Sequence, residues 1–326
     1  MKTEELIGRL KSGERRALAK AITLIEGARP DQRDLAQEVL QSVGVVRNSS
    51  FRIGITGAPG VGKSTFIEKL GMHLLSLGHR VAVLAVDPSS SLSGGSILGD
   101  KTRMPELAAD NRAFIRPSPS SGALGGVNRR THETLLLCEA AGYDVILIET
   151  VGVGQSEVTV TEMVDCLVLL ALPHAGDEVQ AIKKGVMEVL DLLVVHKCDG
   201  SLVESAQQTV REFRNALQLA RHKVPSWTPP VLTASSLHGL GIDEVWQQVL
   251  AFQKTVKSNG WFQQQRLTQN EAWFQHAFQD EVLDLLQRHP GIQQSIIEAC
   301  KAVRRGTVAP FTAARELAAT ILGGVP

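Results

Sequence analysis

The residues best suited to chemistry form a glycine-rich stretch that ends in a lysine and two hydroxyl residues. It consists of Gly57, Ala58, Pro59, Gly60, Val61, Gly62, Lys63, Ser64 and Thr65, and it matches the spacing G-x-x-x-x-G-K-[ST] of a phosphate-binding loop, or P-loop. In such a loop the backbone N–H groups surround the phosphates, the lysine reaches the β and γ oxygens, and the first hydroxyl binds Mg²⁺. The sequence therefore predicts a nucleoside triphosphate site in which these residues bind the nucleotide, Lys63 acts in catalysis and Ser64 binds the metal.

Two acidic residues that follow apolar runs are further candidates for the metal site. Asp87 follows the run Val81–Val86, and Glu149 follows the run Val145–Ile148. An acidic residue in such a place is often only a cap, but two of them beside one P-loop favour Mg²⁺ binding. We expect both carboxylates to bind the metal, Glu149 also to act in catalysis, and the amide of Gly152 to contact the γ-phosphate.

Two long polar segments, at residues 88–103 and 117–126, separate predicted strands. Each is too long for a tight connection, which is typical either of a switch loop that responds to nucleotide or of a plain surface loop. Asp100 lies in the first segment and is a further candidate ligand for Mg²⁺.

A third group of residues indicates which base is bound. His196, Lys197, Cys198 and Asp199 follow the apolar run Leu192–Val195 and resemble the Asn-Lys-x-Asp guanine motif, with histidine in place of asparagine. A carboxylate at Asp199 can accept hydrogen bonds from both guanine N1–H and the exocyclic amine, a donor pattern that adenine lacks. A later stretch, Ser235, Ser236 and Leu237, resembles a loop that offers backbone N–H groups to the guanine carbonyl. We therefore expect GTP and GDP to be the ligands.

The pattern of apolar residues predicts the elements that position these groups. Continuously apolar runs are typical of strands in a parallel sheet that is covered on both faces, and helical patterns alternate with them, as in an open α/β domain. The predicted strands are Phe51–Thr56, Val81–Val86, Phe114–Arg116, Val145–Ile148, Cys166–Ala171, Leu192–Val195 and Val231–Thr233. The predicted helices are Ser64–Leu77, Asn128–Ala141, Ser156–Met163, Asp177–Glu188, Ser201–Ala220 and Ile242–Val256. Ligands of such sheets bind at the carboxyl ends of the strands, where the candidate residues lie.

Helical patterns flank this α/β region on both sides. We expect an N-terminal helical extension at residues 1–47, a P-loop domain at residues 48–257 and a C-terminal helical arm at residues 258–326. In the arm an apolar stripe that includes Phe274, Phe278, Val282 and Leu285 ends near Pro290. The stripe is as compatible with packing on the chain's own sheet as with dimerisation.

Composition excludes several classes of function. The 326 residues carry 34 Lys and Arg against 34 Asp and Glu, so no bulk charge favours nucleic acid or an anionic membrane. The four cysteines are far apart and form no metal motif. The longest apolar run, Cys166–Pro173, is far shorter than the about 20 residues that cross a bilayer, and the charged N-terminal stretch is unlike a signal peptide. We expect a cytoplasmic protein with no nucleic-acid or membrane partner.

Several stretches taken together resemble the MeaB/ArgK family, the GTPases associated with methylmalonyl-CoA mutase. They are residues 57–65, 86–90, 94–104, 115–117, 120–122 and 149–157, and the string 94–104 is specific in a way that the P-loop is not. The resemblance implies an α/β fold with a mostly parallel sheet, of the P-loop class that contains the signal-recognition and metallochaperone GTPases. It also implies Mg²⁺-dependent GTP hydrolysis, stimulated by the partner, that gates delivery of adenosylcobalamin to an acyl-CoA mutase and protects or reactivates that enzyme.

The resemblance further implies a homodimer formed by the C-terminal arm and a switch segment at residues 176–185. Asp177 and Lys184 would be the working residues of this segment, with Lys184 counted among the catalytic residues. Gln155 is a candidate for orienting the attacking water. The sequence departs from the family pattern at His174, Ala175 and His196, all of which lie in loops that sense the nucleotide.

A kinase linked to arginine and ornithine transport is the alternative function, because relatives have carried that name. A kinase needs a base that takes the proton of the acceptor group. The loops offer no clear His or Asp in that role, so the sequence favours the GTPase.

Overall fold

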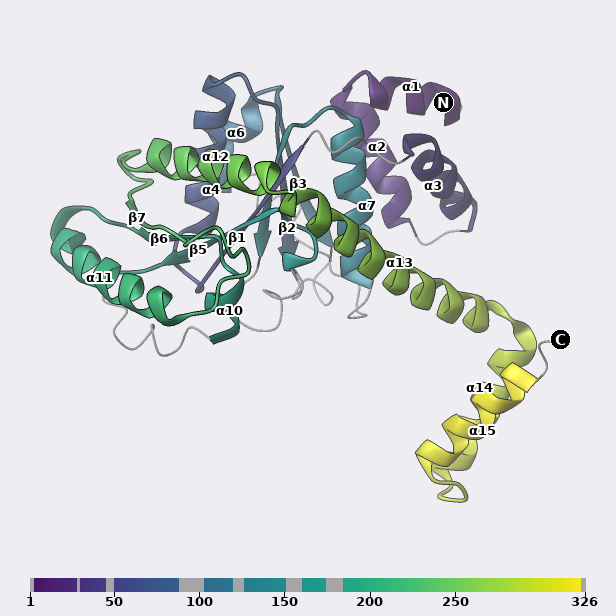
Figure 1. Cartoon of the computed structure of the whole chain (residues 1–326). Coiled ribbons are helices and arrows are strands. Elements are labelled where there is room, and N and C mark those ends of the chain that lie inside the picture. Colours follow the sequence, from purple (N-terminus) through teal and green to yellow (C-terminus); the bar gives the residue numbers. More distant parts are fainter. Residues whose placement is uncertain are drawn as a thin grey trace. The chain divides into compact units, whose positions relative to one another are not determined.

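Seven parallel strands form the centre of the computed structural model, which describes residues 3–27, 30–44, 50–87, 103–119, 126–150, 160–173 and 184–323. Their order is β3-β2-β4-β1-β5-β6-β7, and Figure 1 shows this sheet with the helices around it. The strands are β1 Phe51–Gly57, β2 Val81–Asp87, β3 Ala113–Pro119, β4 Val145–Thr150, β5 Cys166–Ala171, β6 Leu192–His196 and β7 Val231–Ala234. The parallel α/β fold expected from the sequence is confirmed.

All seven expected strands are present, and most extend one or more residues beyond the apolar run that predicted them. The largest difference is β3, which was expected at Phe114–Arg116 but spans Ala113–Pro119. It pairs with β2 along its whole length, from Val81 opposite Ala113 to Asp87 opposite Pro119. Backbone pairing therefore continues the strand through polar and proline residues that the apolar pattern could not mark. Proline is tolerated there because β3 is an edge strand.

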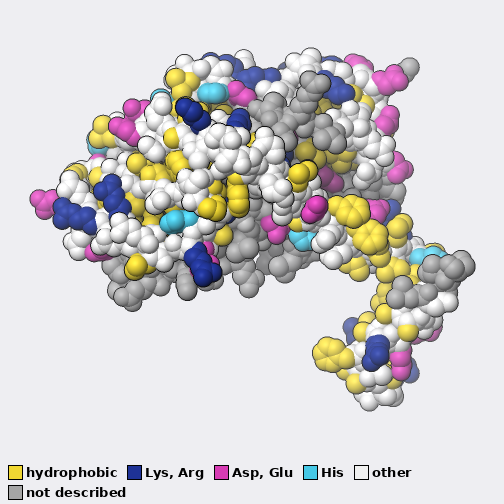
Figure 2. Space-filling view, in the orientation of Figure 1, with side chains coloured by type: hydrophobic (Ala, Val, Ile, Leu, Met, Phe, Trp, Pro, Cys, Tyr) yellow, Lys and Arg dark blue, Asp and Glu magenta, His cyan; other side chains and the backbone are white. Residues whose placement is uncertain are grey.

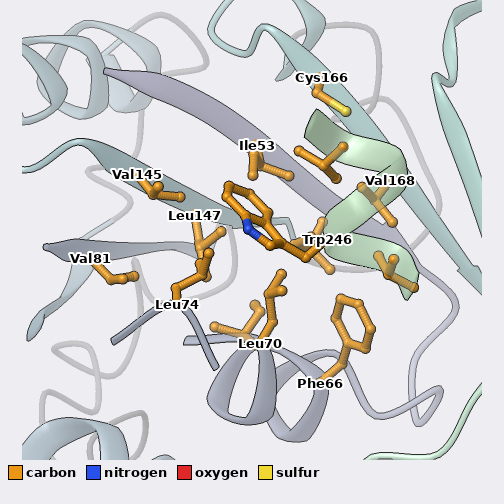
Figure 3. Close-up of a cluster of buried hydrophobic side chains, with 14 of the residues drawn as sticks. Ile53, Phe66, Leu70, Leu74, Val81, Val145, Leu147, Cys166, Val168 and Trp246 are labelled. Atoms are coloured by element: carbon orange, nitrogen blue, oxygen red, sulfur yellow. The ribbon is translucent and has the colours of Figure 1, made fainter. Parts of the chain in front are cut away.

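Helices α4 Lys63–Ser76, α6 Pro105–Ala109 and α12 Ile242–Ser258 cover one face of the sheet. Their apolar side chains meet alternate residues of the central strands, including Ile53, Leu147 and Val168. Figure 3 shows Trp246 of α12 lying between these strand residues and Leu70 of α4. This packing fixes the start of α4, and with it the P-loop, against the end of β1.

The opposite face carries α7 Gly126–Ala140, α10 Lys184–Val189 and α11 Val203–Leu219. Three N-terminal helices, α1 Thr3–Lys11, α2 Arg15–Glu26 and α3 Pro30–Val43, pack on one another and on α7. The expected helices at 64–77, 128–141, 201–220 and 242–256 are confirmed to within about two residues. The expected helix Ser156–Met163 and the first part of Asp177–Glu188 lie mainly outside the described residues.

The chain forms two compact units, residues 1–270 and 271–326. Helix α13 Trp261–Arg288 begins in the first unit and continues into the second, which also contains α14 Pro290–Arg304 and α15 Pro310–Gly323. The helix that carries the Phe274 stripe therefore ends near Pro290, as the sequence predicts. No helix in the described ranges is long and apolar enough to cross a membrane.

Candidate nucleotide site

The P-loop, Glu149 and the residues that end β6 and β7 lie at the carboxyl-terminal edge of the sheet, because the carboxyl ends of parallel strands lie on the same side. β1, which leads into the P-loop, lies between β4 and β5. Glu149 of β4 is in register with Ile55 of β1 and with Ala85 of β2. The ends of β6 and β7, where His196 pairs with Ala234, lie along the same edge. Residues that are far apart in the sequence are thus brought to a single site.

The P-loop requires glycine at two positions for distinct steric reasons. Gly57 has φ of 150°, and a Cβ there would lie 2.4 Å from the carbonyl oxygen of Leu170 in β5. Gly62 has φ of 97°, and a Cβ there would lie 2.9 Å from Cε1 of His196. Both positive φ values also disfavour other residues. The pattern of glycines therefore reflects contact with neighbouring strands as well as room for phosphate.

Lys63 begins α4, and its ammonium group lies over the loop. The Nζ atom donates to the carbonyl oxygen of Gly57 at 2.8 Å and to that of Ala58 at 3.2 Å. Partial burial lowers the pKa of Lys63, and the charge of Glu149 acts in the opposite direction. A phosphate bound by the loop would give this cation a stronger partner than two neutral carbonyl groups.

Ser64 and Glu149 together form a pair of oxygen ligands suited to Mg²⁺. The Ser64 hydroxyl donates to Oε1 of Glu149 at 3.0 Å, although the two residues lie on different elements, α4 and β4. Hydroxyl and carboxylate oxygens are the donors that Mg²⁺ prefers, with the rest of its shell supplied by phosphate and water. These residues fit the ion. Asp87 ends β2 at the same edge, the position of its side chain is not described, and Asp100 lies outside the described residues.

His196 joins two loops of the site. Its Nδ1 lies 2.7 Å from the carbonyl oxygen of Val61 in the P-loop, and its Nε2 lies 2.7 Å from the hydroxyl of Ser236 after β7. The imidazole is buried, and burial lowers its pKa, against the opposing effect of the hydrogen bond to Val61. It is therefore neutral near pH 7.

The residues expected to read guanine lie next to this histidine. Lys197 Nζ donates to the carbonyl oxygen of Gly60 at 2.8 Å, which ties the same segment to the P-loop a second time. The Ser235 hydroxyl donates to Oδ2 of Asp199, and the backbone of Ser235 pairs with that of Leu240. These contacts orient the Asp199 carboxylate at the edge of the sheet.

The structure leaves some expected site residues apart from these contacts. Leu237 is 76% exposed, so its side chain does not help to hold the site together. Lys184 begins α10, and the position of its side chain is not described. Gly152, Gln155 and Asp177 lie outside the described residues. The catalytic, nucleotide-binding and metal-binding roles of all these residues stay predictions.

Sequence reasoning missed the contact of Phe66 with the site. Its ring packs edge-on against His196, with centroids 5.7 Å apart and planes at 82°. Phe66 lies one turn after Lys63 on the buried face of α4. In the sequence it is one of several apolar residues of an amphipathic helix, so no local signal distinguishes it from the rest of the core.

A P-loop at the end of a central parallel strand, with a hydroxyl–carboxylate pair beside its lysine, defines a P-loop nucleoside triphosphatase. The comparison with known families identifies it further. Residues 18–290 match the family described as "Methylmalonyl Co-A mutase-associated GTPase MeaB". The chain belongs to this family, and it is a GTPase.

Relatives agree with this assignment over nearly the whole chain. A "Putative GTPase" of Caulobacter vibrioides is 49% identical over 316 residues, which cover 97% of each chain. The "GTPase ArgK" of Escherichia coli is 46% identical over 96% of this chain and 95% of its own. A solved structure described as "Crystal structure of LAO/AO transport system kinase" superposes with a TM-score of 0.76 at 39% identity, and the match covers 98% of this chain and 97% of that one.

Proposed function

We propose that this GTPase uses GTP binding and hydrolysis to gate delivery of adenosylcobalamin to methylmalonyl-CoA mutase or a related acyl-CoA mutase, and to protect or reactivate that enzyme. The observation that carries the proposal is the family match over residues 18–290, on a chain that retains the P-loop and its Ser64–Glu149 pair. We expect the protein to act in the cytoplasm as a homodimer, with Mg²⁺ and GTP as cofactors.

The chain's own residues would act mainly by holding the phosphates and their charge. Bound Mg²⁺, held by Ser64 and Glu149, would supply positive charge at the β and γ oxygens. Lys63 would leave the carbonyl oxygens of Gly57 and Ala58 and place its ammonium group on the same phosphates. Intrinsic hydrolysis in such switches is slow, so we expect the mutase to raise the rate by ordering loops around the γ-phosphate.

The arrangement of the site favours this function over phosphate transfer to a small acceptor. A kinase needs a free general base next to the acceptor. His196 is engaged by Val61 and Ser236, and Asp199 by Ser235, so neither is placed for that task. Because the superposed relative is called a transport system kinase, the alternative is worth testing in the same assay.

The test is hydrolysis by the purified protein, with GTP and then ATP, alone and with a cobalamin-dependent acyl-CoA mutase. Guanine-specific turnover that rises with the mutase supports the proposal, and Lys63→Ala serves as the inactive control. A second arm follows transfer of adenosylcobalamin to apo-mutase by its absorbance spectrum, with GTP, GDP or no nucleotide. Transfer that ignores the nucleotide would contradict gating. Phosphorylation of added arginine or ornithine would favour the kinase.

A further inference from the structure

The geometry points to His196 as a positioning residue that joins the P-loop to the guanine-recognition loops and so sets the affinity for guanine nucleotides. This inference rests on GTP binding by the chain and is independent of the partner and of cobalamin. His196 stands where the guanine motif has asparagine. The question is therefore whether the imidazole only fills space or takes over a connecting role.

The hydrogen bonds of His196 determine its tautomer. The carbonyl oxygen of Val61 can only accept, so the Nδ1 atom 2.7 Å away must carry the proton and donate it. In the neutral ring Nε2 then has a lone pair, and it accepts from the Ser236 hydroxyl at 2.7 Å. Because burial lowers the pKa of His196, this neutral form is the one present near pH 7. One donor and one acceptor are thus both used.

Packing holds the ring in this orientation. His196 is only 2% exposed, and Ser236 is equally buried. Phe66 of α4 packs edge-on against the imidazole. On another side the ring approaches Gly62 so closely that a Cβ at that residue would lie 3.0 Å from Nδ1. A ring confined in this way cannot rotate to exchange its partners without moving the P-loop.

The hydrogen bonds from Val61 through His196 to Ser236 form a bridge. This bridge connects the groups expected to bind phosphate to the groups expected to recognise the base. Val61 belongs to the phosphate loop, whereas Ser236 follows Ser235, whose hydroxyl holds Asp199. Lys197 adds a parallel contact to Gly60 and adopts a positive φ of 59°, unusual for a residue other than glycine. Loss of the bridge would leave the P-loop and the guanine-recognition loops free to move independently. Nucleotide binding would then have to order both, which lowers the affinity.

Amide side chains can separate the two halves of the bridge. An asparagine amide can take the place of Nδ1 and bond Val61, but it is too short to reach Ser236 as Nε2 does. A glutamine amide can take the place of Nε2 and bond Ser236, but it does not keep the donor to Val61. His196→Asn, His196→Gln, His196→Ala and Ser236→Ala therefore remove different parts of the same connection.

The experiment measures the dissociation constant for GDP by titration with a fluorescent GDP analogue, and KM and kcat for GTP, without any mutase. We expect His196→Ala to raise the GDP dissociation constant and KM about tenfold, the effect of losing a buried hydrogen bond. Its kcat should stay within about threefold of the wild type, since the imidazole does not contact the reacting phosphate. His196→Asn should recover most of the affinity, and more than His196→Gln, because it keeps the contact to the P-loop.

A double-mutant cycle distinguishes a bridge from two separate effects. Ser236→Ala should weaken GDP binding in the wild type but add little to His196→Ala, since the connection is then already broken. Full additivity of the two losses would overturn the bridge. Unchanged GDP affinity in His196→Ala would also overturn it, as would a loss confined to kcat.

A matched control tests whether any histidine packed against an aromatic ring has the same effect. His79 also packs edge-on against an aromatic ring, that of Trp246, and forms a hydrogen bond with Asp144 at 2.9 Å. It precedes β2, so it lies at the amino-terminal ends of the strands, away from the nucleotide site. His79→Ala should leave the affinity for GDP at the wild-type value. If His196→Ala does not fold, as judged by its thermal transition, Ser236→Ala and His196→Asn carry the test, and wild-type GDP affinity in both would overturn the inference.

Discussion

Arg266 and Asp165 form a buried ion pair in which Nη2 of Arg266 lies 2.6 Å from Oδ2 of Asp165. Nη1 of the same guanidinium lies 3.3 Å from Glu139, which also holds Arg52 through two hydrogen bonds of 2.8 and 2.9 Å. The four charges balance. Burial acts to raise the pKa of Glu139, but the two arginines outweigh it and hold the pKa below its usual value. The group joins β1, α7, the residue before β5 and the start of α13.

Removal of Arg266 should destabilise the fold strongly. Arg266→Ala leaves a carboxylate buried without its partner, which typically costs about 3–5 kcal/mol. Urea unfolding measures the free energy of unfolding of the variant. Lys69→Ala is the control, because the pair of Lys69 with Glu106 lies at the surface and such pairs contribute at most about 1 kcal/mol. Equal losses in the two variants would contradict a structural role for the buried group.

The contacts within this buried group of charges could not be predicted from the sequence. The P-loop and the strands could be predicted because their signals are local: a fixed spacing of glycines and lysine, and continuous apolar runs. The partners of Arg266 could not, since Glu139 lies 127 residues away and an arginine on an amphipathic helix is ordinarily solvent-exposed. Likewise, the pairing of Ser64 with Glu149 requires the order of the strands, which no local pattern gives.

The bridge made by His196 could be predicted only in part from the sequence. The sequence marks the residue, because it departs from the guanine motif next to Lys197 and Asp199. It does not tell which atoms the imidazole bonds. That depends on the P-loop and α4 bringing Val61 and Phe66 against the ends of β6 and β7, which only the packed structure establishes.

Asp191 should make the stability of the chain depend on pH between about 4 and 6. Its carboxyl is fully buried, and burial raises its pKa from 3.8 to about 6, against the effects of Lys223 and of the hydrogen bond from the Leu167 amide. Between these values the unfolded chain releases a proton that the folded chain keeps. Stability from this group is therefore lost as pH rises from about 4 to 6, and the penalty is complete above that.

Asp191→Asn tests this prediction, because its amide oxygen can still accept from Leu167. We expect the variant to gain about 3 kcal/mol over the wild type at pH 7 and little at pH 4. Thermal or urea unfolding at both pH values gives the difference in the free energy of unfolding between the variant and the wild type. The contributions of other titratable groups cancel in this difference. The same difference at pH 4 and pH 7 would show that Asp191 ionises normally.

Lys63→Ala should abolish most of the GTPase activity. The ammonium group is expected to stabilise charge on the transferring phosphoryl group, and removal of such a group typically lowers kcat by about 10²–10³-fold. Phosphate release under single-turnover conditions measures it. Lys69→Ala, on a later turn of α4, is the control and should keep the wild-type rate. Hydrolysis by Lys63→Ala at the wild-type rate would show that the lysine has another role.

Two P-loop glycines should differ in their tolerance of alanine. Both have positive φ, 79° at Gly60 and 97° at Gly62, which costs a non-glycine residue about 1–2 kcal/mol. A Cβ at Gly60 would meet no atom within 4 Å, whereas one at Gly62 would strike the His196 ring. Gly62→Ala should therefore lower the unfolding temperature more than Gly60→Ala, and weaken GDP binding more. Equal effects would mean that only the backbone conformation matters.

The exposed aromatic residues of α13 should be required if the chain is a homodimer, as we propose. Phe274 and Phe278 are 70% and 60% exposed, and their rings stack with centroids 6.2 Å apart. Figure 2 shows hydrophobic side chains gathered along this helix. An exposed apolar stripe of this kind is typical of an interface.

Light scattering should therefore give a dimer for the wild type and a monomer for the double variant Phe274→Ser and Phe278→Ser. Leu219→Ser, which changes an exposed apolar residue on α11, should stay dimeric, and a monomeric wild type would refute the proposal.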